Sequence, residues 1–202
     1  MQMIPNQPYA TQSRAEMRVF DQLRHAFSTG DKSGWFALHS LNLPRHEYKR
    51  FGEIDFVVCG PGGLFVLEVK GGGVACHDGI WQTTNRYGET NRLKESPFRQ
   101  AEEALHGLRN KLQGTSVSEF VLGYGVVVPD CDLGIQVSAE WDRPTLCDAR
   151  NFRQFERWLE GLVHHWHQKG QKHNASPEAL RSLKQALRPD FEVAVPLHAK
   201  VH

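Results

Sequence analysis

Several features are absent from this 202-residue chain, and each absence argues against a class of protein or site. It has four cysteines and no Cys-x-x-Cys pair, which argues against a zinc ribbon and favours reduced thiols in a cytoplasmic protein. It has no run of about 18 apolar residues, the length that spans a membrane, and its start shows no signal-peptide pattern. The formal net charge is only +1, so any contact with nucleic acid must come from a local patch of charge.

The chain does have the composition of one globular domain. Its residues are 40% hydrophobic and 23% charged, and its length is sufficient for a proper core. Residues 1–12 are polar, contain two prolines, and are expected to form a flexible lead-in. We expect a core over 13–150 and a helical addition over 151–188. The tail over 189–202 is either an edge strand or a tether to a further domain.

Two apolar runs joined by a Gly-Pro-Gly-Gly segment stand at the centre of the pattern. The runs cover 54–59 and 64–69, and this arrangement predicts a β-hairpin. Asp55 lies near the start of the first run, whereas Glu68 and Lys70 lie near the end of the second. These positions meet in an antiparallel hairpin, and Glu68 and Lys70 share one face because they are two residues apart. Acids in so apolar a context cost free energy unless something compensates them, and a bound cation is one such partner.

Helical and strand patterns surround this hairpin. Ser13 and Glu16 have the spacing of a capping box and predict a helix over 13–28. The remaining elements expected are a strand over 35–43, a second hairpin over 74–84 around Asp78-Gly79, a mobile polar loop over 85–96, a helix begun by Ser96 and Pro97, a buried strand over 120–128, a short edge strand over 145–147, a helix over 151–169 capped by Asn151, and a helix over 177–187.

Several polar residues allow two interpretations that the pattern leaves open. Glu16 either caps its helix or points into a site. Gln100 lies in the first turn of the helix that begins after Ser96, where it is either exposed and inert or faces the same cleft as the hairpin acids. The basic loop over 44–50 is either solvated or holds phosphate through Lys49 and Arg50.

The hairpin residues suit the hydrolysis of a phosphodiester. Asp55 and Glu68 offer hard carboxylate oxygens, which suit Mg²⁺ or Mn²⁺ better than zinc. The backbone carbonyl of Val69 is a natural further ligand. A cation there can polarise a phosphoryl oxygen and lower the pKa of bound water, while Lys70 can orient that water or stabilise charge on the phosphate. The alternative is an ordinary ion pair between Glu68 and Lys70 on a solvated strand, worth at most about 1 kcal/mol.

An ordered set of short segments resembles a known family. The segments are Ala15-Glu16, Gly52-Glu53-Ile54-Asp55, Leu67-Glu68-Val69-Lys70-Gly71, Gly79-Ile80-Trp81 and Ser96-Pro97-Phe98-Arg99-Gln100. Together they resemble the PD-(D/E)xK nuclease superfamily and, more narrowly, its nuclease-related domain, NERD. The resemblance covers about residues 13–128. It implies an α/β fold (an α+β mixed sheet) with a restriction-endonuclease-like αβββαβ core, to which C-terminal helices are added.

The resemblance also implies roles for single residues. Asp55 and Glu68 would be metal ligands, and Lys70 would be the catalytic lysine. Glu16 would be the acidic residue of the first helix and a further ligand, and Gln100 the glutamine of the helix after the sheet. The resemblance therefore favours a place in the site for both Glu16 and Gln100, over a capping role for Glu16 and an exposed position for Gln100. The candidate nucleic-acid contacts are Arg45, Lys49, Arg50 and Arg99.

We therefore expect a Mg²⁺- or Mn²⁺-dependent nuclease, with DNA favoured over RNA as its substrate. The alternative is a catalytically silent nucleic-acid-binding or interaction module of a larger helicase-type protein, because proteins with this domain often carry a helicase, kinase or DNA-binding module beyond it. The joint presence of Asp55, Glu68 and Lys70 favours the enzyme, since an inactive relative would be expected to lose one of them.

Overall fold

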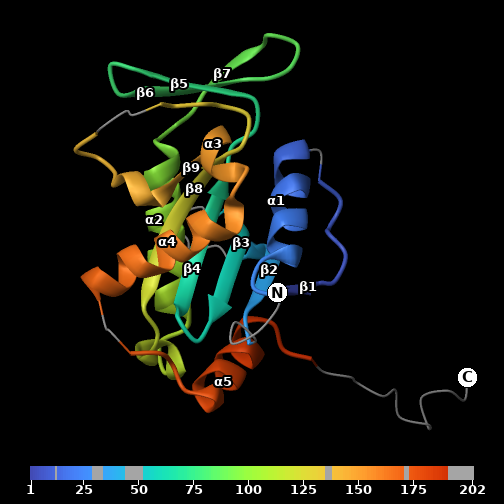
Figure 1. Cartoon of the computed structure of the whole chain (residues 1–202), viewed down its shortest axis with the longest axis vertical. Helices are drawn as coiled ribbons and strands as arrows, with labels where there is room; N and C mark the ends of the chain where they lie inside the picture. The colour runs from blue at the N-terminus through green and yellow to red at the C-terminus, as the bar shows by residue number, and fades with distance from the viewer. Residues whose placement is uncertain (12, 29–33, 44–51, 135–137, 171–172, 191–202) are drawn as a thin grey trace, which may run out of the picture.

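A six-stranded mixed sheet forms the centre of the molecule, and a small three-stranded antiparallel sheet projects from one end of it (Figure 1). The computed structural model describes residues 1–11, 13–28, 34–43, 52–134, 138–170 and 173–190. In chain order the elements are β1 (Gln2–Ile4), α1 (Arg14–His25), β2 (Phe36–Asn42), β3 (Glu53–Gly60), β4 (Gly63–Val69), β5 (Gly73–His77), β6 (Ile80–Thr84), β7 (Thr90–Arg92), α2 (Pro97–Lys111), β8 (Leu122–Val128), β9 (Leu146–Asp148), α3 (Ala149–Phe152), α4 (Phe155–Lys169) and α5 (Pro177–Leu187).

The strand order of the large sheet is β1-β2-β3-β4-β8-β9. Strand β3 is antiparallel to both of its neighbours, β2 and β4. The other pairs are parallel: β1 with β2, β4 with β8, and β8 with β9. The carboxyl ends of β4, β8 and β9 therefore lie at the same edge of the sheet as the start of β3. The expected mixed α/β fold is confirmed, and the order α1-β2-β3-β4-α2-β8 runs through it.

Helices cover both faces of this sheet. Helices α1 and α4 pack on one face, with Phe20 and Leu159 among the buried side chains (Figure 1). Helices α2 and α5 pack on the other face through side chains such as Leu108 and Leu183. A third cluster joins Trp81 of β6 to Phe98 of α2, and so anchors the small sheet to the larger one.

The predicted central hairpin is present as β3 and β4, paired from Gly60↔Gly63 to Phe56↔Leu67. Its turn requires glycine at two positions. Gly63 has a φ of +138°, a conformation that residues with a side chain rarely adopt. A Cβ on Gly60 would lie 2.2 Å from the ring of Trp35, so that only glycine lets this indole pack on the turn.

Three sequence expectations about the elements are corrected by the structure. Residues 1–4 are not a flexible lead-in, because Gln2–Ile4 pairs with β2 and the side chains of Met1 and Met3 are buried. Part of the loop expected over 85–96 is the strand β7, whose residues are polar and exposed, so the sequence shows no apolar pattern there. The helix expected over 151–169 is divided into α3 and α4.

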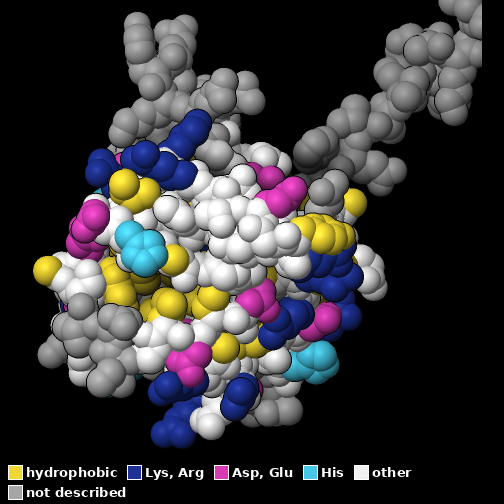
Figure 2. All heavy atoms as spheres, turned by 90° about the horizontal axis from the view of Figure 1, so that it is seen from above, with side chains coloured by type: hydrophobic (Ala, Val, Ile, Leu, Met, Phe, Trp, Pro, Cys, Tyr) yellow, Lys and Arg dark blue, Asp and Glu magenta, His cyan; other side chains and the backbone are white. Residues whose placement is uncertain are grey.

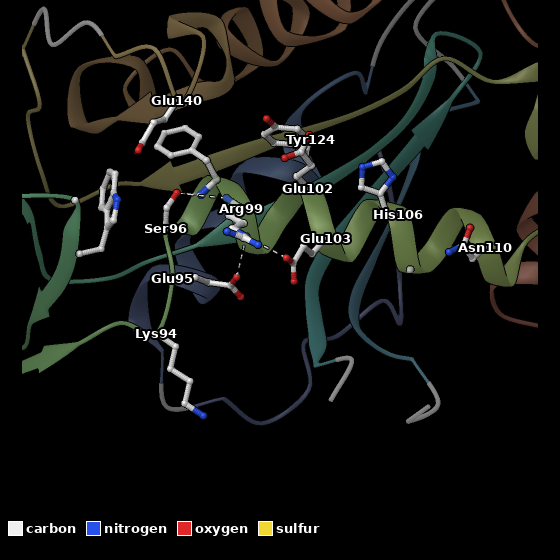
Figure 3. Close-up of a pocket in the computed structure, with 14 residues that line it drawn as sticks. Lys94, Glu95, Ser96, Arg99, Glu102, Glu103, His106, Asn110, Tyr124 and Glu140 are labelled. Atoms are coloured by element: carbon white, nitrogen blue, oxygen red, sulfur yellow. Dashed lines mark hydrogen bonds and ion pairs between the residues drawn. The ribbon is translucent and has the colours of Figure 1, made fainter. Parts of the chain in front are cut away.

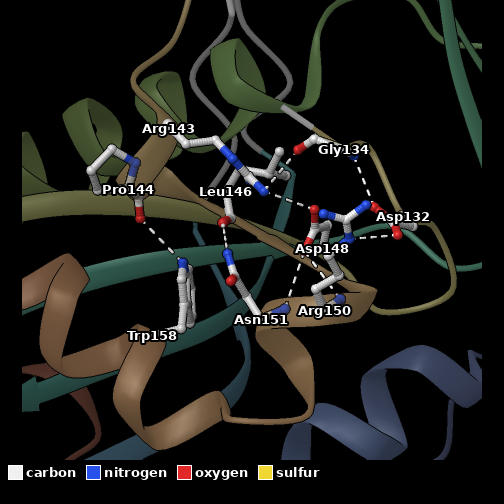
Figure 4. A network of polar contacts seen from close by, with 9 residues as sticks. All are labelled: Asp132, Gly134, Arg143, Pro144, Leu146, Asp148, Arg150, Asn151 and Trp158. Carbon is white, nitrogen blue, oxygen red and sulfur yellow. Dashed lines mark hydrogen bonds and ion pairs between the residues drawn. The ribbon is translucent and has the colours of Figure 1, made fainter. Parts of the chain in front are cut away.

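The start of α3 is set by a polar network around Asp148, which is fully buried (Figure 4). Asp148, not Asn151, caps α3: its carboxylate accepts hydrogen bonds from the backbone N–H groups of Arg150 and Asn151, both at 3.1 Å. Arg143 donates to the second oxygen of Asp148 at 2.8 Å. Asn151 instead donates from its side chain to the carbonyl of Leu146 at 3.1 Å, which holds α3 against β9.

The other elements follow the pattern of the sequence. Ser13 and Ser96 accept hydrogen bonds from the first turns of α1 and α2, as their capping positions predict.

All four cysteines are free. Within the described part of the chain, no helix combines the length and apolar character that a membrane crossing requires. The predicted tail over 189–202 lies, beyond Asp190, outside the described residues.

Candidate active site

The start of β3 and the end of β4 bring three predicted site residues together. The register that pairs Phe56 with Leu67 places Asp55 opposite Glu68. The backbone N–H of Val69 donates to Oδ2 of Asp55 at 2.8 Å. Lys70 Nζ lies 2.6 Å from Glu68 Oε1. The convergence predicted from the hairpin pattern is therefore confirmed.

These residues line a cleft of about 400 Å³ between the sheet edge and α2. Its described lining consists of Leu43, Gly52, Glu53, Asp55, Glu68, Lys70, Glu95, Gln100, Glu103 and Ala104. Five of these residues are acidic and only Lys70 is basic. So acidic a cleft attracts a cation and repels a phosphate unless a cation is bound there.

The pair of Glu68 and Lys70 is not an ordinary surface ion pair. The side chain of Glu68 is 12% exposed and that of Lys70 is 21% exposed. Asp55 lies beside them, so it is part of the same polar cluster. The alternative of a solvated pair with an incidental Asp55 does not fit this burial.

Burial disfavours the charge of both carboxylates. It is the main reason that the pKa of Asp55 lies well above its ordinary value, and the negative charges of Glu68 and Glu16 raise this pKa further. The Val69 N–H and Lys70 act in the opposite direction. Burial likewise raises the pKa of Glu68, against the opposing effect of Lys70. A cation bound between the two carboxylates would relieve this cost.

Glu16 stands in the first turn of α1 and is held by its neighbours. Its backbone N–H donates to the side chain of Ser13 at 3.2 Å. Its carboxylate does not complete a capping box, because the Ser13 N–H donates to Thr11 Oγ1 at 3.0 Å. Instead Glu16 Oε2 lies 3.5 Å from Nε2 of His39, and a hydrogen bond with this ring is the main cause that lowers the pKa of Glu16. Glu16 is not among the cleft residues above, but its charge acts on both cleft carboxylates.

Gln100 and Arg99 differ in how they relate to the cleft. Gln100 lines it, and its buried Oε1 has no hydrogen-bond partner among the described residues. The side chain of Arg99 is 70% exposed and forms ion pairs with Glu95 at 3.7 Å and Glu103 at 3.1 Å. Its predicted contact with nucleic acid stays a prediction. The other three candidates for that role, Arg45, Lys49 and Arg50, lie outside the described residues.

A larger groove of about 1140 Å³ runs along α2 beside the cleft and shares Glu95 and Glu103 with it (Figure 3). Arg99 lies between these two acids and joins them by its ion pairs. Farther along α2, Glu102, His106 and Asn110 line the same groove. The cleft therefore opens onto a surface that an extended substrate could follow.

Sequence reasoning missed four polar residues at or near this site. Glu53, Glu95 and Glu103 line the cleft, and His39 contacts Glu16. Of these four, only His39 could have been identified from the sequence. It is a titratable residue in the middle of an apolar strand, and such a residue needs a specific partner. The three glutamates resemble ordinary surface residues in the sequence.

The donors of the cleft fit a hard divalent cation. Asp55 and Glu68 provide two carboxylates, and Gln100 provides a buried amide oxygen without a partner. Such oxygen ligands are preferred by Mg²⁺ and Mn²⁺. Within the described ranges, no group of three or more His, Cys, Asp and Glu residues is arranged to hold a metal, so backbone or substrate oxygens would have to complete the set.

Comparison with protein families agrees with this geometry. The family model described as the nuclease-related domain, NERD, matches residues 11–128. This segment runs from the start of α1 to the end of β8 and contains the whole cleft, whereas β9 and helices α3 to α5 lie beyond it. The chain matches no curated protein and no solved structure. Because the matched segment covers more than half of the 202 residues and includes the candidate site, the chain belongs to the nuclease-related domain (NERD) family.

Proposed function

We propose that this chain is a Mg²⁺- or Mn²⁺-dependent nuclease that hydrolyses phosphodiester bonds, with DNA as the favoured substrate. In this proposal its core is a restriction-endonuclease-like fold of the PD-(D/E)xK superfamily. The observation that supports it best is the half-buried cluster of Asp55, Glu68 and Lys70 in one acidic cleft. Membership of the nuclease-related family adds to this support.

Each cluster residue has a role in the proposed reaction. Asp55 and Glu68 would hold the divalent ion, with the Val69 carbonyl and Glu16 as further ligands. When bound, this ion would supply Lewis acidity to the phosphoryl group and to an attacking water. Lys70 is held at the cleft by its contact with Glu68, and there it would orient the water or stabilise negative charge on the phosphate. Gln100 would hydrogen-bond to the water or the substrate through its free oxygen.

Binding of DNA would depend on local contacts. On the face of the molecule seen in Figure 2, the described Lys and Arg side chains form small groups interspersed with acidic ones. This agrees with a net charge of only +1. Neutralisation of the acidic cleft by the metal ion would then be a condition for the approach of a phosphate.

A nucleic-acid-binding or interaction module without catalysis is the second candidate. The absence of a complete metal-binding group of side chains among the described residues favours it. Salt-dependent binding of DNA without cleavage, in the presence of several divalent metals, would support this candidate.

The test is a cleavage assay with supercoiled and single-stranded DNA in Mn²⁺. Asp55→Ala and Lys70→Ala should each lower the rate at least about 100-fold, because each removes a group that stabilises charge in the transition state. Glu178→Ala and Lys111→Ala, at exposed positions of α5 and α2, are the matched controls and should cut as wild type does. Cleavage that survives in both site variants would show that the site is assigned wrongly. No cleavage by the wild-type protein would favour the second candidate.

A further inference from the structure

His39 lies at the centre of β2 and is 1% exposed. Its ring is stacked on Phe56, with centroids 4.9 Å apart and an interplanar angle of 22°. The edge contact with Phe20 of α1 has a centroid distance of 5.5 Å. Two aromatic side chains therefore fix the plane of the imidazole between the sheet and α1.

Hydrogen bonding fixes which ring nitrogen carries the hydrogen. The backbone N–H of Tyr9 donates to Nδ1 of His39 at 3.2 Å, so Nδ1 presents its lone pair. In the neutral ring the hydrogen is then on Nε2. Nε2 is buried and has no partner in hydrogen-bond geometry among the described residues, and Oε2 of Glu16 lies 3.5 Å from it.

We propose that His39 is a positioning residue that holds the Glu16 carboxylate beside the cleft of Asp55 and Glu68 through its Nε2–H group. The proposal rests on the nuclease function proposed above, because it gives Glu16 a part in holding the divalent ion. A carboxylate ligand is commonly oriented by a hydrogen-bond donor behind it, and loss of this donor typically lowers metal affinity about 10- to 100-fold.

The position of Glu16 favours this role over a purely structural one. His39 pairs across the sheet with Phe56, the residue after Asp55, so the contact with His39 places Glu16 near the start of β3. The side chain of Glu16 is 19% exposed, and the side chains of Thr11 and Ser13 interact with it as well as His39.

Segments outside the matched family region contact His39, at its ring and at its backbone. Tyr9, which donates to the ring, precedes that region. Arg188 follows α5 and donates to the carbonyl of His39 at 3.3 Å and to that of Ile4 at 2.8 Å. The N-terminal and C-terminal parts of the chain thus meet behind the residue that contacts Glu16.

The test measures Mn²⁺ affinity by calorimetry in wild type, His39→Phe, His39→Gln, Glu16→Ala and the double variant Glu16→Ala/His39→Phe. His39→Phe should weaken Mn²⁺ binding about 10-fold or more, whereas His39→Gln, which keeps a donor at the position of Nε2, should restore most of the affinity. In the Glu16→Ala background the His39→Phe change should have no further effect. His25→Phe, at an exposed position of α1, is the control and should bind as wild type does.

The proposal would be overturned if His39→Phe or Glu16→Ala bound Mn²⁺ as tightly as wild type. It would also be overturned if His39→Phe lowered the affinity for Mn²⁺ equally in the wild-type and the Glu16→Ala backgrounds. Nitrogen-15 NMR of the wild-type protein provides an independent readout if the phenylalanine variant does not fold or if wild type binds no Mn²⁺. His39 should show the neutral Nε2–H tautomer, and the Nδ1–H tautomer would contradict the proposed contact. Failure of the nuclease proposal is distinguishable, because the protein would then cut no DNA while the effects of His39 on Mn²⁺ binding and on the tautomer would persist.

Discussion

At the scale of single residues, Asp55 shows how function and stability oppose each other. Its carboxylate lies in a cleft where burial and the charges of Glu68 and Glu16 raise its pKa well above the ordinary value. In the unfolded chain Asp55 ionises at the ordinary value, whereas in the fold it keeps its proton to a higher pH. Between these two pH values the folded state binds more protons, so the free energy of unfolding falls as pH rises through that window.

Asp55→Asn should therefore stabilise the metal-free protein at neutral pH by about 1–2 kcal/mol. The amide removes the buried charge and can still accept the hydrogen bond from Val69. The advantage should shrink as pH falls from the raised pKa of Asp55 to the ordinary pKa of aspartate, and it should vanish below the ordinary pKa, where wild-type Asp55 is protonated in both states. Denaturant unfolding in EDTA at several pH values measures this, with Asp21→Asn on the exposed side of α1 as control. A variant that is less stable than wild type at neutral pH would contradict the argument.

The sequence predicts the cluster of Asp55, Glu68 and Lys70 because a hairpin is local: its turn residues fix which positions face each other. It does not predict the contact between His39 and Glu16. That contact depends on how α1 packs on the sheet. The tautomer of His39 depends on Tyr9, which is 30 residues away in the chain, so no short-range sequence pattern predicts it.

At the scale of elements, the close approach of α4 to β8 depends on glycine. A Cβ on Gly123 would lie 2.4 Å from the ring of Trp166, and a Cβ on Gly125 would lie 3.1 Å from that of Trp158. Trp166 also donates from Nε1 to the carbonyl of Tyr124 at 3.0 Å, which fixes its indole over the strand. The sequence predicted this buried strand and a helix over 151–169, but not that the helix packs on the glycines of the strand.

Gly123→Ala should lower the free energy of unfolding by about 1–3 kcal/mol, because the indole must move away from the strand. Gly161→Ala is the matched control within α4, since a Cβ there meets nothing within 4 Å. That change should instead raise stability by up to about 1 kcal/mol, as alanine favours a helix over glycine. Equal effects of the two substitutions in urea unfolding would show that the packing of Trp166 does not control this contact.

At the scale of the whole molecule, the two ends of the described chain are tied together. Arg188 donates to the carbonyls of Ile4, His39 and Ser40, at 2.8 Å, 3.3 Å and 3.1 Å. The sequence could not predict this link, because residues 184 positions apart meet only once the sheet and α5 have formed. The flexible lead-in expected over 1–12 is wrong for Gln2–Ile4, because these residues pair with Phe36–Leu38 of β2.

Arg188→Ala should cost about 1–3 kcal/mol of stability, because three carbonyls lose a charged donor. Arg181→Ala is the control, since the side chain of Arg181 is 70% exposed and pairs only locally with Glu178; it should change stability by less than about 0.5 kcal/mol. Guanidinium unfolding monitored by tryptophan fluorescence measures both. Equal stabilities of the two variants would mean that the ends of the chain are held by other contacts.

The central claim is that Asp55 and Glu68 hold a divalent ion beside Lys70, and a crystal soaked in Mn²⁺ tests it most directly. Anomalous scattering from manganese locates the ion without reference to the protein map. We predict one strong peak in the cleft, roughly 2.0–2.4 Å from oxygens of Asp55 and Glu68. The same peak should be absent from an Asp55→Ala crystal. A cleft without manganese at saturating concentration, or a peak that does not contact either carboxylate, would contradict the account.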